Sequence, residues 1–97
     1  MTKLTQKIYT ELLKSDETYL LLFSADWCGS CKMLKPSLEK VAKEKGLEIY
    51  TYMVDEDNSL SNSLGVMSLP TVIKFKGDKE ISRFTGNHTQ KKLQELI

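Results

Sequence analysis

Residues 19–32 read Tyr19-Leu20-Leu21-Leu22-Phe23-Ser24-Ala25-Asp26-Trp27-Cys28-Gly29-Ser30-Cys31-Lys32, and this stretch decides the fold. It begins with an all-apolar run, residues 19–23, that is typical of a strand buried on both faces of a sheet. Between Cys28 and Lys45 the apolar residues follow helical spacing, at Leu34, Leu38, Val41 and Ala42. The stretch therefore predicts a central strand that leads through a short loop into a helix, with both cysteines at the junction.

Two further elements flank this unit. Leu4, Ile8 and Leu12 recur every four residues among polar positions, which predicts an amphipathic helix that ends near Ser15-Asp16. Residues 48–54 are rich in strand formers and run into the acidic turn Asp55-Glu56-Asp57. We therefore expect a helix before the central strand and a second strand after the central helix.

The second half of the chain predicts a short helix, a hairpin and a final helix. Residues 58–64 fit a short helix capped by Asn58. Residues 71–76 and 80–85 alternate between apolar and polar, and the Gly77-Asp78 pair between them makes a tight hairpin turn. After Gly86, Asn87 or His88 can start a final helix that buries three apolar residues, Leu93, Leu96 and Ile97.

These elements predict an α/β fold. Helices that cross between the early strands imply parallel strand pairs, and the hairpin adds an antiparallel edge. The result is one mixed sheet of about four strands with helices on both faces. A chain of 97 residues without repeats or linkers is expected to form a single domain over residues 1–97.

The charge balance excludes several classes of partner. With 14 basic and 13 acidic residues the formal net charge is +1, so we expect neither nucleic acid nor a membrane surface as a partner. The longest apolar run, residues 19–23, is far too short to cross a bilayer. Residues 1–11 contain no continuous apolar stretch of the kind that a signal peptide has, so we expect a cytoplasmic protein. We also expect a monomer.

Cys28 and Cys31 have the spacing of a reversible dithiol pair. On a first helical turn, residues three apart lie on one face, so the two sulfurs can bond to each other. Unpaired backbone N–H groups and the macrodipole at a helix N-terminus favour an anion, and so the thiolate of Cys28. We therefore expect Cys28 to be the nucleophile and Cys31 the resolving thiol.

The whole chain resembles the thioredoxin family. The residues that carry the resemblance are Phe23, Ala25, Trp27-Cys28-Gly29, Cys31-Lys32, Pro36, Asp55, Leu69-Pro70-Thr71, Phe75 and Gly86. The resemblance implies a thioredoxin fold and a cis bond before Pro70, which would lie beside the cysteine pair. It also implies a shallow groove for an extended substrate segment, lined by Trp27, Gly29, Ser30, Ser68, Leu69, Pro70 and Gly86.

The chain departs from the family pattern inside the cysteine motif. Ser30 replaces the proline of the usual Cys-Gly-Pro-Cys sequence. Proline in a first helical turn is pre-organised, so Ser30 should loosen the loop, while its hydroxyl offers a hydrogen bond to a nearby sulfur. We expect a redox potential that is more oxidising than is usual for the family.

A second departure removes a buried charge. Leu22 occupies the place where most thioredoxins have a buried aspartate, and Thr51 the place of its lysine partner. Such a carboxylate disfavours a neighbouring thiolate and can move the proton of the resolving thiol. Without it Cys28 should ionise more readily, and deprotonation of Cys31 must rely on water, the departing thiolate or Asp26.

Two further departures are structural. Ser24 replaces the second tryptophan of the family, and the N-terminal strand is shortened to residues 1–3 at most. The short strand leaves a barer sheet edge.

Other interpretations of the cysteine pair have less support. A zinc site normally requires four ligands, and the chain offers one histidine and no third cysteine, so we expect no metal. Two inert core cysteines would not explain Trp27, Gly29 and Pro70 beside them.

We predict a thiol–disulfide oxidoreductase that reduces protein disulfides without a metal or organic cofactor. By resemblance, its partners are protein disulfide substrates and a thioredoxin reductase. Two alternatives stay open within the enzyme class: a dedicated electron donor to one client, and a weak oxidant or isomerase. The alternative from another class is a binding module with a thioredoxin fold, in which the thiols play no part.

Overall fold

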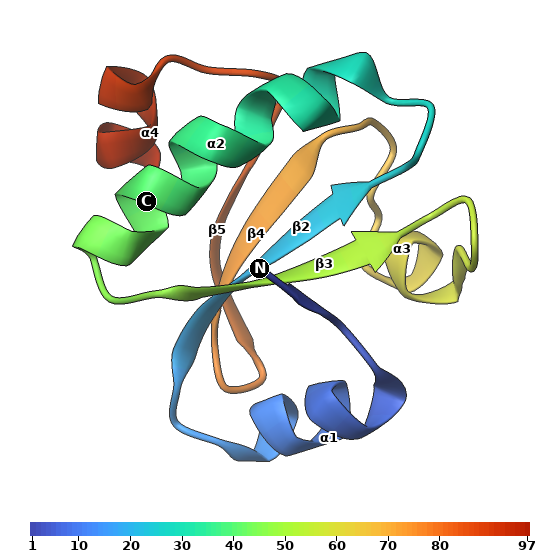
Figure 1. Cartoon of the computed structure of the whole chain (residues 1–97). Coiled ribbons are helices and arrows are strands. Elements are labelled where there is room, and N and C mark those ends of the chain that lie inside the picture. The colour runs from blue at the N-terminus through green and yellow to red at the C-terminus, as the bar shows by residue number, and fades with distance from the viewer.

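The computed structural model describes residues 1–97 and contains a single five-stranded sheet in the order β1-β3-β2-β4-β5 (Figure 1). Its strands are β1 (Thr2–Lys3), β2 (Thr18–Ser24), β3 (Glu48–Met53), β4 (Thr71–Lys76) and β5 (Lys79–Thr85). Its helices are α1 (Gln6–Lys14), α2 (Gly29–Glu44), α3 (Ser59–Ser63) and α4 (Gln90–Leu96).

The central strand is β2. It pairs with β3 in parallel on one side and with β4 in antiparallel fashion on the other. β1 pairs in parallel with β3, and β5 pairs in antiparallel fashion with β4. The mixed sheet is therefore the one that the order of elements predicts, and the antiparallel hairpin forms one of its edges.

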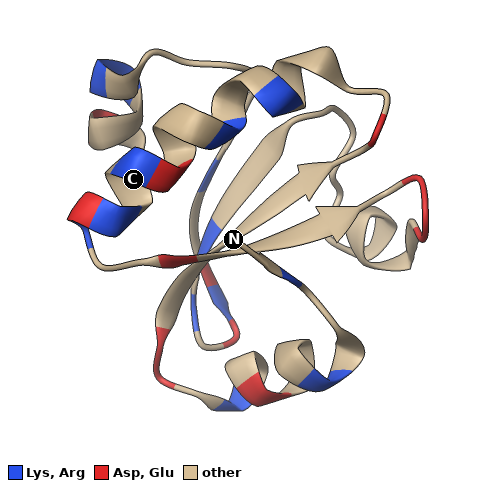
Figure 2. Cartoon of the chain, in the orientation of Figure 1, with Lys and Arg blue, Asp and Glu red and all other residues tan.

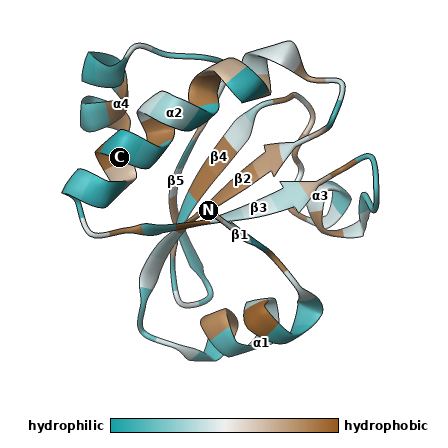
Figure 3. Ribbon diagram, viewed as in Figure 1, coloured by the Kyte–Doolittle hydropathy of each residue, from teal (hydrophilic) through white to brown (hydrophobic).

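Alternate residues of β2 supply the two halves of the core. Leu20 and Leu22 face α2 and α4, where they pack with apolar residues of both helices, among them Leu34, Leu38 and Leu93. Tyr19, Leu21 and Phe23 face the opposite side, where α1 supplies Leu12 and the adjacent loop Leu4. Figure 3 shows the same division, with hydrophobic β2 and β4 between helices that are apolar on one side only.

The N-terminal segment forms the fifth strand. β1 is two residues long, and both of its residues, Thr2 and Lys3, are exposed. The predicted shortening of this strand is confirmed, and the short β1 still covers part of the outer edge of β3. Leu4 follows it directly and is buried, while α1 begins only at Gln6 behind the cap Thr5.

Two helix caps differ from the sequence prediction. Asn58 precedes α3, but its side chain makes no capping hydrogen bond; the Asp57 carboxylate instead accepts from the backbone N–H of Ser59 at 3.0 Å. The final helix begins at Gln90, because Thr89 accepts from Lys92 N–H and so caps it later than Asn87 or His88 would. In both places another residue within reach of the free N–H groups takes the capping role.

The β4–β5 hairpin is fastened to the start of β2 through Gly77. Its backbone N–H donates to the Glu17 carbonyl at 2.9 Å, and its carbonyl accepts from the Tyr19 hydroxyl at 2.7 Å. Gly77 has a φ of 58°, and a Cβ there would lie 2.5 Å from the Ser15 carbonyl oxygen. Only glycine meets both demands, so the turn brings the hairpin against the end of α1.

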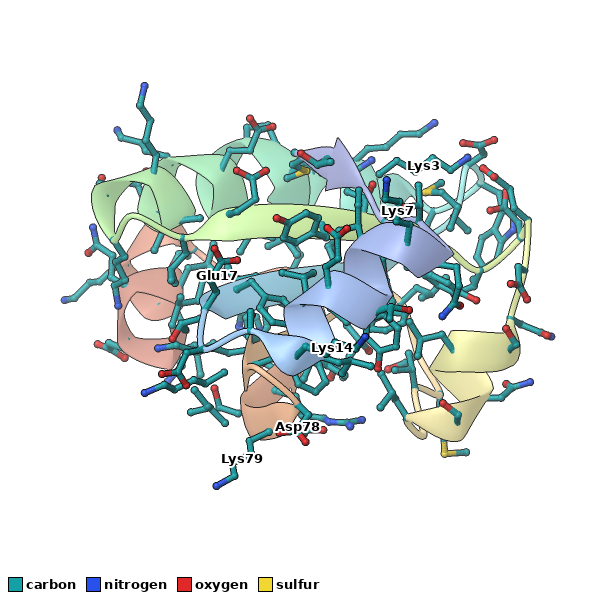
Figure 4. All side chains as sticks on the ribbon, turned by 90° about the horizontal axis from the view of Figure 1, so that it is seen from below. Lys3, Lys7, Lys14, Glu17, Asp78 and Lys79 are labelled. Carbon is teal, nitrogen blue, oxygen red and sulfur yellow. A yellow bond between two sulfur atoms is a disulfide. The ribbon has the colours of Figure 1, made fainter.

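The charged side chains stay on the surface. Figure 4 looks onto the sheet from the side of α1, and the exposed Lys7, Lys14 and Lys79 reach outward from it. None of the helices combines the length and the apolar content that a membrane span needs.

Replacing Tyr19 by Phe should flatten the loss of stability at alkaline pH. Burial raises the pKa of Tyr19 from its ordinary value to about 12, so the fold favours the neutral phenol. The resulting stability is present below pH 10 and is lost as the pH rises through 12. By pH 11.5 the wild type should lose about 2 kcal/mol more of its free energy of unfolding than Tyr19→Phe does.

Urea unfolding at several pH values between 9 and 11.5 measures this difference. At neutral pH the variant should be less stable by about 1 kcal/mol, because it lacks the hydrogen bond to Gly77. Parallel pH profiles for the two proteins would contradict the assignment.

Candidate active site

The two cysteines lie where the carboxyl end of β2 meets the first turn of α2. Cys28 is the N-cap of α2, and its backbone N–H donates to the Ala25 carbonyl at 3.1 Å, which closes the connecting loop. A disulfide joins Cys28 to Cys31, with their Cα atoms 5.3 Å apart. The helix thus starts at the disulfide, and the backbone N–H of Cys31 in its first turn points at the Cys28 sulfur.

The Cys28 sulfur has two polar neighbours. The backbone N–H of Cys31 donates to it at 3.2 Å, and the Ser30 hydroxyl oxygen lies 3.4 Å away. The predicted contact between Ser30 and a sulfur is therefore present. An N–H donor, a hydroxyl and the helix dipole all stabilise negative charge at Cys28, which is what a thiolate nucleophile needs.

The two cysteines differ in accessibility. Cys28 is 5% exposed and Cys31 fully buried, and both pack against Ala25, Val54 and Leu69. A large substrate can therefore approach the pair only from the side of Cys28.

The loop before β4 lies against the same end of the sheet. The bond between Leu69 and Pro70 is cis, as the resemblance implies. The Thr71 hydroxyl donates to the Ser68 carbonyl at 2.6 Å, and Gly86 N–H donates to the Pro70 carbonyl at 2.9 Å. Gly86 thus ties this loop to the end of β5, and Leu69 beside it contacts the cysteine cluster.

A groove of about 400 Å³ runs from Trp27 toward α3. Of the residues expected to line it, Trp27, Ser68 and Leu69 do so. Gly29, Ser30, Pro70 and Gly86 are not among its walls; Pro70 is buried, and Gly29 and Ser30 belong to the exposed first turn of α2. The remaining walls come from residues that the sequence did not single out: Val54, Asn58, Ser61, Asn62, Val66 and Met67.

Met67 is the most notable of these additional residues. Its side chain is 96% exposed, and Trp27 across the groove is 73% exposed. Two large, exposed apolar side chains on the walls of one groove offer contact area to an apolar segment of a partner. The position of Met67, directly before Ser68-Leu69-Pro70, was a usable signal in the sequence.

Asp26 does not approach the sulfurs through a hydrogen bond. Its side chain is exposed, and its backbone N–H donates to the Asp55 carboxylate at 3.2 Å, which joins the loops after β2 and β3. Figure 2 shows the acidic residues of both loops at this end of the sheet. The expected role of Asp26 in proton transfer stays a prediction.

The core beneath α2 is apolar at Leu22, the position where most members of the family have a buried aspartate. Leu22 is fully buried in the cluster that includes Leu34, and its register partner on β3 is Thr51. The site therefore has no buried acid at this position. The His, Cys, Asp and Glu side chains form no group of three or more that could hold a metal ion.

The protein-family model described as Thioredoxin matches residues 1–97. The chain belongs to the thioredoxin family. Thioredoxin of Rickettsia bellii is 35% identical over 89 residues, which cover 90% of this chain and 85% of the relative. Thioredoxin of Bacillus subtilis is 38% identical over 85 residues, which cover 86% and 82%.

The structural comparison agrees with the sequence relatives. A mutant thioredoxin from Halobacterium salinarum superposes with a TM-score of 0.86 at 28% identity and covers all of this chain and 86% of its own. The predicted thioredoxin fold is confirmed. Family membership and the Cys28–Cys31 pair make this protein a protein-disulfide oxidoreductase.

Replacing Ser30 by Ala should slow the alkylation of Cys28. In the dithiol form the Ser30 hydroxyl can turn its proton toward the Cys28 sulfur and stabilise the thiolate. We expect the rate of reaction with iodoacetamide at pH 7 to fall roughly three- to tenfold in Ser30→Ala. Ser63→Ala, which removes an exposed hydroxyl on α3, is the matched control. Equal rates for Ser30→Ala and the wild type would show that the hydroxyl does not act on the sulfur.

Proposed function

We propose that this protein reduces disulfide bonds in other proteins, with Cys28 as the nucleophile and Cys31 as the resolving thiol. The observation that carries the proposal is the position of Cys28 as the N-cap of the 16-residue helix α2. Its sulfur accepts a hydrogen bond from the Cys31 N–H, and the exposed Trp27 precedes it. This position activates one sulfur and leaves the other buried behind it.

The reaction proceeds by two exchanges. The Cys28 thiolate attacks one sulfur of the substrate disulfide, forms a mixed disulfide and releases the other substrate sulfur as a thiolate. The Cys31 thiolate then attacks the Cys28 sulfur, which forms the Cys28–Cys31 disulfide and releases the second substrate thiolate. Two electrons have passed from the cysteine pair to the substrate.

The substrate reaches the pair along the groove. An extended segment of the client lies between Trp27 and the loop of Ser68 and Leu69, with Met67 in contact with its apolar side chains. Backbone groups beside Pro70 pair with this segment. Gly29, Ser30 and Gly86 complete the surface that the client contacts.

The disulfide is reduced again by a partner dithiol, for which family membership favours a thioredoxin reductase. The protein acts as a monomer in the cytoplasm, where it contributes to electron transport and to redox homeostasis. The chemistry needs no metal or organic cofactor on this chain, because both electrons reside in the two thiols.

The two cysteines should respond differently to replacement by serine. Cys28→Ser should no longer catalyse insulin reduction with dithiothreitol or a thioredoxin reductase as the electron source, because the protein has lost its nucleophile, and only the uncatalysed rate should remain. Cys31→Ser should also fail to turn over, but its Cys28 should accumulate as a mixed disulfide with the substrate. Non-reducing gels and mass spectrometry detect this adduct.

Lys91→Ala, on the exposed side of α4, serves as the control and should reduce insulin at the wild-type rate. A stable adduct through Cys31 in the Cys28→Ser protein would reverse the assigned roles. A biological function that survives replacement of both cysteines would overturn the proposal in favour of a binding module.

A further inference from the structure

Ser24 is the last residue of β2 and is fully buried. Its hydroxyl oxygen is the one buried side-chain nitrogen or oxygen in the structure that has no hydrogen-bond partner. The other buried hydroxyls, of Tyr19, Ser61 and Thr71, donate to the carbonyls of Gly77, Asn58 and Ser68. An unpaired buried hydroxyl lowers the stability of the folded protein. A hydrogen-bond partner in another state of the molecule would explain why a serine occupies this position.

The alternation of β2 places Ser24 on the face that α2 covers. Leu20 and Leu22 belong to the cluster with Leu34 and Leu38, and Ser24 is the next residue on that face. Phe23 and Leu21 belong to the opposite cluster. The Ser24 side chain therefore faces α2 and not α1.

The direction of α2 sets Cys31 opposite Ser24. The chain turns back after β2, so residues near the start of α2 lie above residues near the end of β2 (Figure 1). Cys31, Leu34 and Leu38 share the buried stripe of α2 and are all fully buried. From these opposite directions we infer that Cys31, at the start of the buried stripe of α2, lies nearest Ser24 at the end of β2.

The chemistry of Cys31 changes with its redox state. The disulfide sulfur of Cys31 carries no proton and makes no hydrogen bond with the Ser24 hydroxyl, whereas in the dithiol form Cys31 is a buried S–H group that can act as a weak donor. Cys31 forms one cluster with Cys28 and Ala25, and the residues that pack against this cluster, Val54 and Leu69, have apolar side chains. The Ser24 hydroxyl, on the face that α2 covers, can accept a hydrogen bond from the thiol and can donate one to the thiolate.

We propose that the Ser24 hydroxyl pairs with the Cys31 thiol in the reduced form and loses this partner when the disulfide forms. The inference rests on the proposed function, because it assigns Ser24 to the redox cycle of the same pair. Ser24 thereby stabilises the dithiol form selectively. It supplies a polar group beneath α2 in a protein whose Leu22 supplies none.

The consequence is a shift in the redox equilibrium. Two glutathione molecules reduce the Cys28–Cys31 disulfide and become glutathione disulfide, and each protein sulfur gains one proton. The hydrogen bond to Ser24 exists only on the product side of this reaction. A net hydrogen bond of ordinary strength changes such an equilibrium constant roughly three- to tenfold, and tenfold corresponds to about 30 mV.

The test is a redox titration of Ser24→Ala in glutathione buffers, followed by the fluorescence of Trp27. The equilibrium constant for reduction should fall roughly three- to tenfold, so the variant becomes harder to reduce. Urea unfolding of both redox forms gives an independent readout. Ser24→Ala should stabilise the disulfide form, which loses an unpaired buried hydroxyl, without stabilising the dithiol form.

Two further variants separate the hydroxyl from a merely structural effect. Tyr19→Phe removes a buried hydroxyl at the other end of β2, whose partner is the Gly77 carbonyl, and should change the stability of both redox forms equally and leave the potential unchanged. Ser24→Thr keeps the hydroxyl and should titrate within about twofold of the wild type.

Three results overturn the inference. They are a wild-type potential in Ser24→Ala, a Ser24→Thr shift as large as that of Ser24→Ala, and equal stability changes in the two redox forms of Ser24→Ala. The last result is also expected if a bound water satisfies Ser24 in both forms. Loss of the reversible transition in the wild type itself would instead defeat the proposed function.

Discussion

Burial of β2 on both faces is the constraint on which the rest of the structure depends. Leu20 and Leu22 complete one half of the core, and Tyr19, Leu21 and Phe23 complete the other. Full burial of one such side chain contributes about 1.5–3 kcal/mol, while domains of this size have a net stability of about 5–15 kcal/mol. Because β2 contributes so much of the burial free energy, displacing it would unfold the core. Its carboxyl end is therefore a rigid support for a reactive group.

The active site is joined to this rigid strand by one short loop, between β2 and α2. Cys28 closes that loop with a hydrogen bond to Ala25, begins α2 and bonds to Cys31, so the sulfur chemistry shares residues with the joint between strand and helix. Helix N–H groups and the Ser30 hydroxyl then act on Cys28 without any further element. The loop of Ser68-Leu69-Pro70 and the exposed Trp27 add the surface for a client.

Sequence patterns predicted those parts of the fold that depend on local periodicity. The apolar run at 19–23, the hairpin at Gly77 and the buried Leu93 are all where the patterns indicate. The capping of α3 by Asp57 depended on competition between neighbouring side chains, which no periodicity resolves. Met67 is important because it shares a groove with Trp27, and Ser24 because α2 covers it. Such contacts between distant parts of a chain leave no local pattern in the sequence.

The most direct test of the central claim is an equilibrium redox titration of the Cys28–Cys31 pair in glutathione or dithiothreitol buffers, monitored by Trp27 fluorescence. We expect one reversible two-electron transition. Its potential should lie above the established thioredoxin value of about −270 mV and below the value of about −180 mV for protein disulfide isomerase. A potential near −120 mV, typical of strong disulfide-forming oxidants, would contradict the reductase role, and the absence of a reversible transition would contradict the dithiol chemistry itself.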